Sequence, residues 1–432
     1  MSQLRRSLEN RARLERQLDQ HVLCDFVVLD NGAMPFGKLL PDGIGNFYGT
    51  ASEGGPGNCL ASIGFVYVQV GCGTVFKLTP NSNGTFKETI LYNFAGNSYP
   101  NSDGAVPKSA LIFDSSGNLY GTTEGGGKYG GGTVFRLSPA TNGAWTETIL
   151  YNVGVVSYDG YAPTGTLLFD SSGNLYGTTE YGGKYHEGTV FQLTPSFSGD
   201  WHEKQLYQFG AFATDGQTPT GALTFDSAGN LYGTTYSGGI APKNYASCYQ
   251  GGPCGTVFKL TAGTWAETQV LVFDGTNGGN PTGFVILDSL GNLYGTASMG
   301  GVYNDGEVFE LTPASSGQWT ETTIHSFAGL NGDGYSPQGD LVFDSSGHLY
   351  GTTSLGGTNA GLCHVNGCGI VYKLTPPGSG RTWSEKVLHT FNLSTDGMEP
   401  FAGVVLDSAG NLYGATSLGG SGNQGTVFQI VP

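Results

Sequence analysis

One short unit recurs seven times along the chain, and it constrains the fold more than any other feature. Its centre is a tyrosine followed by glycine, as in residues 119–121, which read Leu-Tyr-Gly. Six residues before each tyrosine stands an aspartate, and seven residues before that aspartate stands a proline. The seven tyrosines are Tyr48, Tyr120, Tyr176, Tyr232, Tyr294, Tyr350 and Tyr413. Because every copy keeps this register, the chain is a tandem repeat.

Each repeat is predicted to form four strands, and none of it shows helical periodicity. In the second repeat the strands cover residues 110–113, 118–122, 132–137 and 145–151. The first is apolar on both faces, which is typical of a strand deep in a sheet. Asp-Ser-Ser-Gly follows it, the residue types of a type I turn that ends in a left-handed glycine. Seven such units predict an all-β fold, a seven-bladed β-propeller of four-stranded blades.

The two ends of the chain predict how the ring closes. Residues 426–430 form the third strand of the last repeat, and residues 21–26 align with the fourth strand at 90–94. We therefore expect the N-terminal strand to complete the last blade. A solenoid has no need of this arrangement, because its end repeats are capped. The prediction is a single propeller domain over residues 21–432, preceded by a basic leader over residues 1–20.

The leader interleaves five arginines with leucines, but no apolar core of 7–15 residues follows its charged start, so it is not a secretory signal peptide. Two interpretations stay open. The segment is a poorly ordered or misassigned start that replaces a lost signal, or it is a short basic helix that lies on the propeller or on a partner.

Over residues 21–432 the repeat resembles the bacterial tandem repeat called GloVer. The resemblance rests on the strings Leu-Tyr-Gly-Thr-Thr, Gly-Thr-Val-Phe-x-Leu-Thr-Pro, Trp-Thr-Glu-Thr and Leu-Tyr-x-Phe. Proteins of that family carry varied cell-surface anchors, so the resemblance implies an exported, surface-associated protein and supplies no catalytic residues. This chain differs in its leader and shows no sorting or anchor segment after Pro432.

Charge and hydropathy limit the classes of partner that the chain can bind. The chain has 18 basic and 34 acidic residues and a formal net charge of −16, so phosphate backbones and anionic membranes repel it. No stretch approaches the ~18 consecutive apolar residues of a membrane span. We expect an extracellular or cell-surface monomer with no nucleic acid and no membrane span.

The cysteines predict an oxidising compartment. Six of the seven form pairs, each within one loop between the second and third strands, and only the lengthened loops carry them. A crosslink stabilises such a loop by about 2–3 kcal/mol, whereas a zinc site needs four ligands and each loop offers at most three. We therefore predict no metal, a buried free thiol at Cys24, and disulfides between Cys59 and Cys72, Cys248 and Cys254, and Cys363 and Cys368.

An Asp or Asn four residues before each proline forms a candidate polar ring at the channel mouth. Hard oxygen ligands of this kind suit calcium, the one cofactor worth considering. We favour the structural interpretation, in which Asp or Asn before glycine forms a local turn. The seven residues are Asn31, Asp103, Asp159, Asp215, Asn277, Asp333 and Asp396.

The outer strand begins with tryptophan in five repeats and carries a glutamate two residues later. A glycan could stack on these rings, but their presence in blade after blade favours packing between blades. The tryptophans are Trp145, Trp201, Trp265, Trp319 and Trp383.

The loops between the second and third strands are the least repetitive and most aromatic surface, so we place the ligand there. The candidates are Tyr181, Lys184, Tyr185, His186, Tyr245, Tyr249, Tyr303, Asn304, Asp305 and His364. The third position after each proline is expected to face the channel and holds a single acid, which argues against a metal enzyme. These residues are Lys38, Ala110, Thr166, Ala222, Phe284, Asp340 and Gly403.

We predict an exported, non-catalytic propeller that binds a glycan or a protein at the loop face. The chain has no Gly-x-Ser-x-Gly elbow, no His-Glu-x-x-His and no phosphate loop. Two alternatives remain: an enzyme that cleaves polysaccharides or hydrolyses lactones at the channel mouth, and a structural component of the surface or of adhesion.

Overall fold

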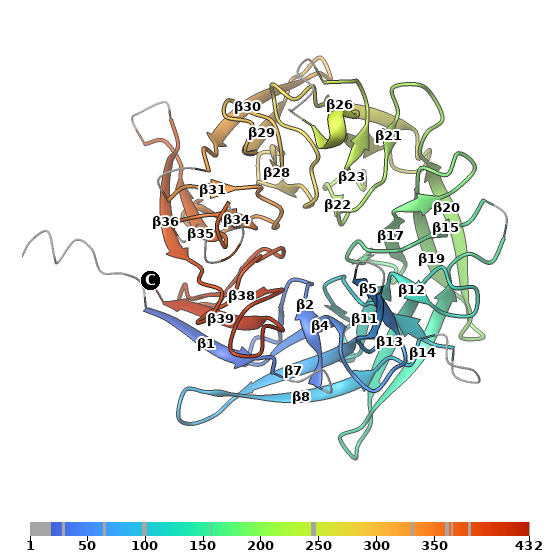
Figure 1. Ribbon diagram of the computed structural model, residues 1–432. Helices are drawn as coiled ribbons and strands as arrows, with labels where there is room; N and C mark the ends of the chain where they lie inside the picture. The colour runs from blue at the N-terminus through green and yellow to red at the C-terminus, as the bar shows by residue number, and fades with distance from the viewer. Residues whose placement is uncertain are drawn as a thin grey trace, which may run out of the picture.

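The computed structural model describes residues 19–27, 31–63, 66–96, 102–156, 158–242, 248–329, 332–358, 363, 366–378 and 382–431. Most of the predicted leader, residues 1–18, lies outside the described residues. Seven antiparallel sheets surround a central channel, which confirms the all-β, seven-bladed propeller (Figure 1). No helix among these residues is long and apolar enough to cross a membrane.

Each blade has four strands, counted from the channel outward. Blade 1 consists of β3 (Leu40–Pro41), β4 (Phe47–Glu53), β7 (Thr74–Pro80) and β8 (Phe86–Asn93). Blade 2 consists of β10 (Ile112–Phe113), β11 (Leu119–Thr123), β13 (Thr133–Pro139) and β14 (Trp145–Asn152). Blade 3 consists of β16 (Leu168–Phe169), β17 (Leu175–Thr179), β19 (Thr189–Pro195) and β20 (Trp201–Gln208). In blade 1, β2 (Ala33–Pro35) also pairs with β4.

The remaining blades repeat this order. Blades 4 to 7 are β22 (Thr224–Phe225), β23 (Leu231–Thr235), β25 (Thr256–Leu260) and β26 (Glu267–Val272); β27 (Ile286–Leu287), β28 (Leu293–Ala297), β29 (Glu307–Pro313) and β30 (Trp319–Ser326); β32 (Val342–Phe343), β33 (Leu349–Thr353), β35 (Ile370–Thr375) and β36 (Ser384–Thr390); β37 (Val405–Leu406), β38 (Leu412–Thr416), β39 (Thr426–Val431) and β1 (Asp19–Asp25).

The innermost strand is shorter than the sequence predicts. In blade 2 it covers Ile112–Phe113 rather than residues 110–113. The missing positions hydrogen-bond to neighbouring blades, because the blades converge at the channel. The Thr50 hydroxyl of blade 1 donates to the Ser109 carbonyl at 2.9 Å, and the Ala110 N–H donates to Thr166 Oγ1 at 3.3 Å.

A glycine–aromatic pair forms the centre of each blade. Gly121 of β11 lies opposite Phe135 of β13, and a Cβ on Gly121 would come within 2.7 Å of the Phe135 ring. The missing side chain therefore leaves room for an aromatic ring to lie across the second strand. The rings, all buried, are Phe76, Phe135, Phe191, Phe258, Phe309, Tyr372 and Phe428.

Neighbouring blades pack through the tyrosine that precedes this glycine. The ring centroid of Tyr48 lies 5.1 Å from that of Phe113 and 6.4 Å from that of Trp145, both in the next blade. Tyr176 likewise lies 6.0 Å from Trp265. The tryptophans therefore pack between blades at these junctions, as predicted.

The N-terminal strand lies at the outer edge of blade 7. β1 pairs antiparallel with β39 over Asp19↔Val431 to Asp25↔Thr426, beginning two residues before the expected position 21. Phe26, 1% exposed, then continues into blade 1, where its ring lies 5.3 Å from Phe76. Cys24 is free but half-buried rather than buried as predicted, because it lies on this edge strand.

Deletion of residues 1–26 should lower the melting temperature and promote association, because it removes β1 and leaves the Val427–Phe428 edge of β39 unpaired. Deletion of residues 1–17 leaves β1 whole and should change neither property. Calorimetry and size-exclusion chromatography of the two truncated proteins provide the test. Identical behaviour would show that β1 does not close the ring.

A glutamate on the outer strand of one blade lies against the preceding blade. The Tyr92 hydroxyl of blade 1, for example, contacts Glu147 Oε2 of blade 2 at 3.2 Å. Burial is the largest cause that raises the pKa of these carboxyls. The pKa rises to about 7 at Glu88, Glu147, Glu203, Glu267 and Glu321.

Stability should fall as the pH rises from about 5 to 8. These glutamates have a pKa near 4.5 when exposed, so over this window the folded state binds more protons than the unfolded state, and linkage then favours unfolding at higher pH. We expect the melting temperature, measured by calorimetry at constant ionic strength, to be lower at pH 8 than at pH 5.5. The variant Glu147→Gln should show a shallower slope. A melting temperature that rises over this range would contradict the assignment.

Candidate ligand-binding site at the channel mouth

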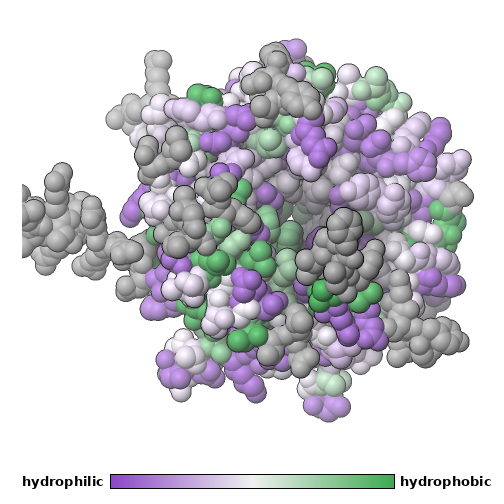
Figure 2. All heavy atoms as spheres, viewed as in Figure 1, coloured by the Kyte–Doolittle hydropathy of each residue, from purple (hydrophilic) through white to green (hydrophobic). Residues whose placement is uncertain are grey.

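A cavity of about 250 Å³ occupies the channel, and all seven blades line it. The space-filling view is hollowed at the centre of the ring (Figure 2). Six of the seven positions expected to face the channel line this cavity, namely Lys38, Ala110, Thr166, Ala222, Phe284 and Asp340. The seventh, Gly403, packs so closely on Asp340 that a Cβ there would overlap the Asp340 backbone.

A lysine and an aspartate provide the charge inside the cavity. Burial lowers the pKa of Lys38 and raises that of Asp340, and the attraction between the two groups opposes both shifts. Lys38 Nζ lies 5.6 Å from the centroid of Phe284, and Asp340 Oδ1 accepts a hydrogen bond from the Phe284 N–H at 3.3 Å. The cavity thus presents a donor and an acceptor beside an aromatic ring.

A second charged pair lies nearer the mouth. Lys108 Nζ forms an ion pair with Glu124 Oε2 at 2.6 Å and lies 5.6 Å from the centroid of Phe36. Phe36 stacks on Phe401 of blade 7, with the two ring centroids 5.1 Å apart. Glu180 also lines the cavity and, with the threonines of blades 3 to 5, makes its wall polar.

An exposed pair of tyrosines adjoins the cavity on blade 3. Tyr161 of β15 (Gly160–Tyr161) pairs with Tyr181 of β18 (Tyr181–Gly182), and their stacked rings have centroids 5.6 Å apart. Tyr161 is 44% exposed and Tyr181 is 40% exposed. Tyr181 directly follows Glu180, which lines the cavity, so the stack lies next to a cavity residue in the chain although neither tyrosine lines the cavity itself.

The structure brings together some of the predicted ligand residues. Tyr181, Lys184 and Tyr185 share blade 3, and Lys184 Nζ lies 5.0 Å from the centroid of Tyr185. His186 and Asn304 adopt positive φ angles in tight turns, and Asp305 bridges to Gly300. Exposed Tyr249 and Tyr303 belong to blades 4 and 5 and do not line the cavity. Tyr245 and His364 lie outside the described residues.

Tyr161, Lys108, Glu124 and Glu180 were missed by sequence reasoning. Tyr161 lies in the connection between blades, whereas the predicted ligand residues all belong to the loops between second and third strands. Alignment of the repeats contained a usable signal, because an aromatic residue directly after Asp-Gly occurs only at Tyr161 and Tyr335.

The candidate polar ring lies at the blade junctions rather than around the cavity. Asp103 accepts hydrogen bonds from the Tyr92 hydroxyl at 2.8 Å and from the N–H groups of Ala95 and Gly96. Asp159, Asp215 and Asp396 similarly accept from Tyr151, Tyr207 and His389. None of the seven ring residues, all of them described, lines the channel cavity. Calcium binding by this set stays a prediction.

The three predicted disulfides are present and hold the lengthened loops. They join Cys59 to Cys72, Cys248 to Cys254, and Cys363 to Cys368. In blade 1 the crosslink buries Cys72 completely against the end of the outer strand.

Family comparison agrees with the repeat seen in the sequence. The model of the Gloeobacter/Verrucomicrobia repeat matches residues 60–245, 206–363 and 241–432. The chain belongs to this family. The resemblance to GloVer repeats is thereby confirmed, and the blades are the structural form of Gloeobacter/Verrucomicrobia repeats in this protein. None of the curated proteins compared with the chain matches it significantly.

Several solved structures are similar in fold. A luciferin-regenerating enzyme is 14% identical with a TM-score of 0.43, and the match covers 77% of this chain and 91% of that one. A putative 6-phosphogluconolactonase from Bacteroides uniformis is 14% identical with a TM-score of 0.44, and the match covers 78% of this chain and 80% of that one. A putative oxidoreductase (glucose dehydrogenase) from Thermus thermophilus is 16% identical with a TM-score of 0.40, and the match covers 74% of this chain and 95% of that one. Similarity this low carries no argument about activity.

Proposed function

We propose that this protein is an exported, non-catalytic β-propeller that binds a glycan at the channel mouth. The observation that carries the proposal is the exposed Tyr161–Tyr181 stack next to a cavity of about 250 Å³ that both polar and apolar residues line. Exposed tyrosine rings offer an apolar face with a polar edge, which matches the mixed surface of a sugar ring. Export is supported by the disulfides, which persist in oxidising compartments.

The charges in the cavity support binding of a hydroxyl-rich ligand. Lys38 and Lys108 donate hydrogen bonds, whereas Asp340 and Glu180 accept them, and sugar hydroxyls do both. A pocket with a few polar groups placed among apolar ones is typical of small-ligand sites.

The carboxyl groups of the cavity favour binding over catalysis. Glycoside hydrolysis needs two carboxyl groups on either side of the scissile bond. Two carboxyl groups, Asp340 and Glu180, line the cavity, but Asp340 interacts electrostatically with Lys38, an arrangement that suits binding.

The test is a glycan array followed by titration of the best ligand into the purified protein. Tyr181→Ala should weaken binding at least about fivefold, the loss expected for an anchoring side chain. Lys38→Met should weaken it as well. Tyr303→Ala is the matched control, because Tyr303 is 60% exposed and, unlike Tyr181, has no neighbour in the chain that lines the cavity, and it should bind as the wild type does.

Four outcomes would overturn the proposal. Equal losses in Tyr181→Ala and Tyr303→Ala would place the ligand elsewhere on the loop face. Turnover of a polysaccharide or a lactone, seen by product analysis, would favour the enzyme alternative. Self-association with no saturable ligand would favour the structural alternative, and binding of a protein but no glycan would change the ligand class.

A further inference from the structure

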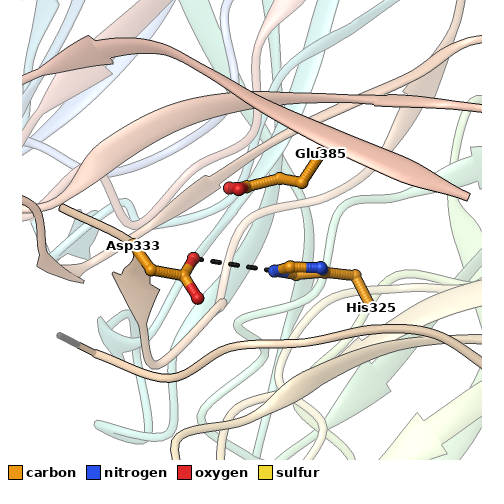
Figure 3. Close-up of side chains that lie close together, drawn as sticks. All are labelled: His325, Asp333 and Glu385. Carbon is orange, nitrogen blue, oxygen red and sulfur yellow. Dashed lines mark ion pairs between the residues drawn. The ribbon is translucent and has the colours of Figure 1, made fainter. Parts of the chain in front are cut away.

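One blade junction brings together three side chains of the kinds that bind transition metals. His325 lies on β30 of blade 5, Asp333 lies in the connection that leads to β31 (Gly334–Tyr335), and Glu385 lies on β36 of blade 6. One ligand atom from each falls within 4.8 Å of the other two. Figure 3 shows the three side chains pointing toward a common space, with His325 Nε2 3.6 Å from Asp333 Oδ1.

At another junction a tyrosine hydroxyl fills the corresponding space. The Tyr92 hydroxyl contacts Asp103 at 2.8 Å and Glu147 at 3.2 Å, so it links the two carboxyl groups. Histidine replaces tyrosine at position 325 and is shorter. Its Nε2 atom is buried without a hydrogen-bond partner among the described residues, and this sets the junction apart, since Glu385 Oε1 is unpartnered just as Glu147 Oε1 is at the Tyr92 junction. A separation of 3.6 Å is too long for a hydrogen bond.

A second histidine shows that replacing tyrosine by histidine does not by itself separate the imidazole from the aspartate. His389 occupies the same position in blade 6, and its Nε2 atom lies only 2.7 Å from Asp396 Oδ2. At that junction Gln20, opposite Ile430, takes the place that Glu385 holds opposite Leu374. The wider spacing therefore occurs where a second carboxylate, that of Glu385, is present.

We propose that His325, Asp333 and Glu385 form a zinc site that joins blade 5 to blade 6. Zinc takes imidazole nitrogen and carboxylate oxygen at ~2.0–2.1 Å, which places two tetrahedral ligands about 3.3–3.4 Å apart. The observed 3.6 Å is close to this value. Three protein ligands leave a fourth position for water. Calcium and magnesium fit less well, because they prefer oxygen ligands in larger number.

The surroundings hold the ligands in place. The N–H groups of Ala328 and Gly334 donate to the Asp333 carboxylate at 2.8 and 2.6 Å, and the His325 ring stands edge-on to Phe327 with centroids 4.6 Å apart. Such supporting contacts orient metal ligands. The side chains of His325 and Asp333 are 21% and 19% exposed, so the site lies close to the protein surface.

The test uses the full chain, stripped with a chelator and then titrated with zinc chloride. We expect one equivalent to bind, with a rise in melting temperature, and cobalt(II) to give the visible absorption of a tetrahedral site. His325→Tyr recreates the hydroxyl contact of the other junctions, so it should fold and lose the metal. His389→Tyr is the same change at a junction where Gln20 stands in place of Glu385, and this variant should keep the metal.

Three results would overturn the proposal. Wild-type protein that binds no zinc would do so directly. Equal zinc stoichiometry in His325→Tyr and His389→Tyr would do so as well, as would undiminished affinity in Glu385→Gln.

Discussion

The pairing of a glycine with an aromatic ring across each blade is the constraint on which the rest of the structure depends. The tip of a ring such as that of Phe258 lies against Gly233, where a Cβ would come within 2.6 Å of it. Side chains alternate along a strand, so this contact also sets the other face. The flanking Tyr232 and Thr234 then point together to the next blade, where Tyr232 meets Trp319 and Thr234 donates to the Gly283 carbonyl.

This scaffold explains how seven similar blades can enclose a site with no symmetry. Packing fixes the second and third strands, whereas the position that faces the channel differs in residue type from blade to blade. It holds Lys38 in blade 1, Phe284 in blade 5 and Asp340 in blade 6. The repeat thus supplies a rigid ring, and single substitutions within it supply the chemistry of the cavity.

Much of this was predictable because the repeat is strict. The register of Asp, Tyr and Gly located the blades, the residues that face the channel and the crosslinked loops. The length of the innermost strand was not predictable, because it depends on how closely the Ser109 backbone approaches the neighbouring blade. Nor could the sequence show that Asp103 accepts a hydrogen bond from Tyr92, because that contact depends on how the folded chain packs. Likewise no local motif joins His325 to Glu385, which meet only through the packing of two blades.

The most direct test of this account is the stability of Gly233→Ala against Gly378→Ala. A Cβ at Gly233 would overlap the Phe258 ring, whereas a Cβ at Gly378 would meet no atom within 4 Å. Overpacking costs about 1–3 kcal/mol, and surface changes usually stay within about 0.5 kcal/mol. We predict that chemical denaturation will show a loss of this size for Gly233→Ala and almost none for Gly378→Ala. Equal stability of the two variants would contradict the claim that the glycine–aromatic pair determines the blade.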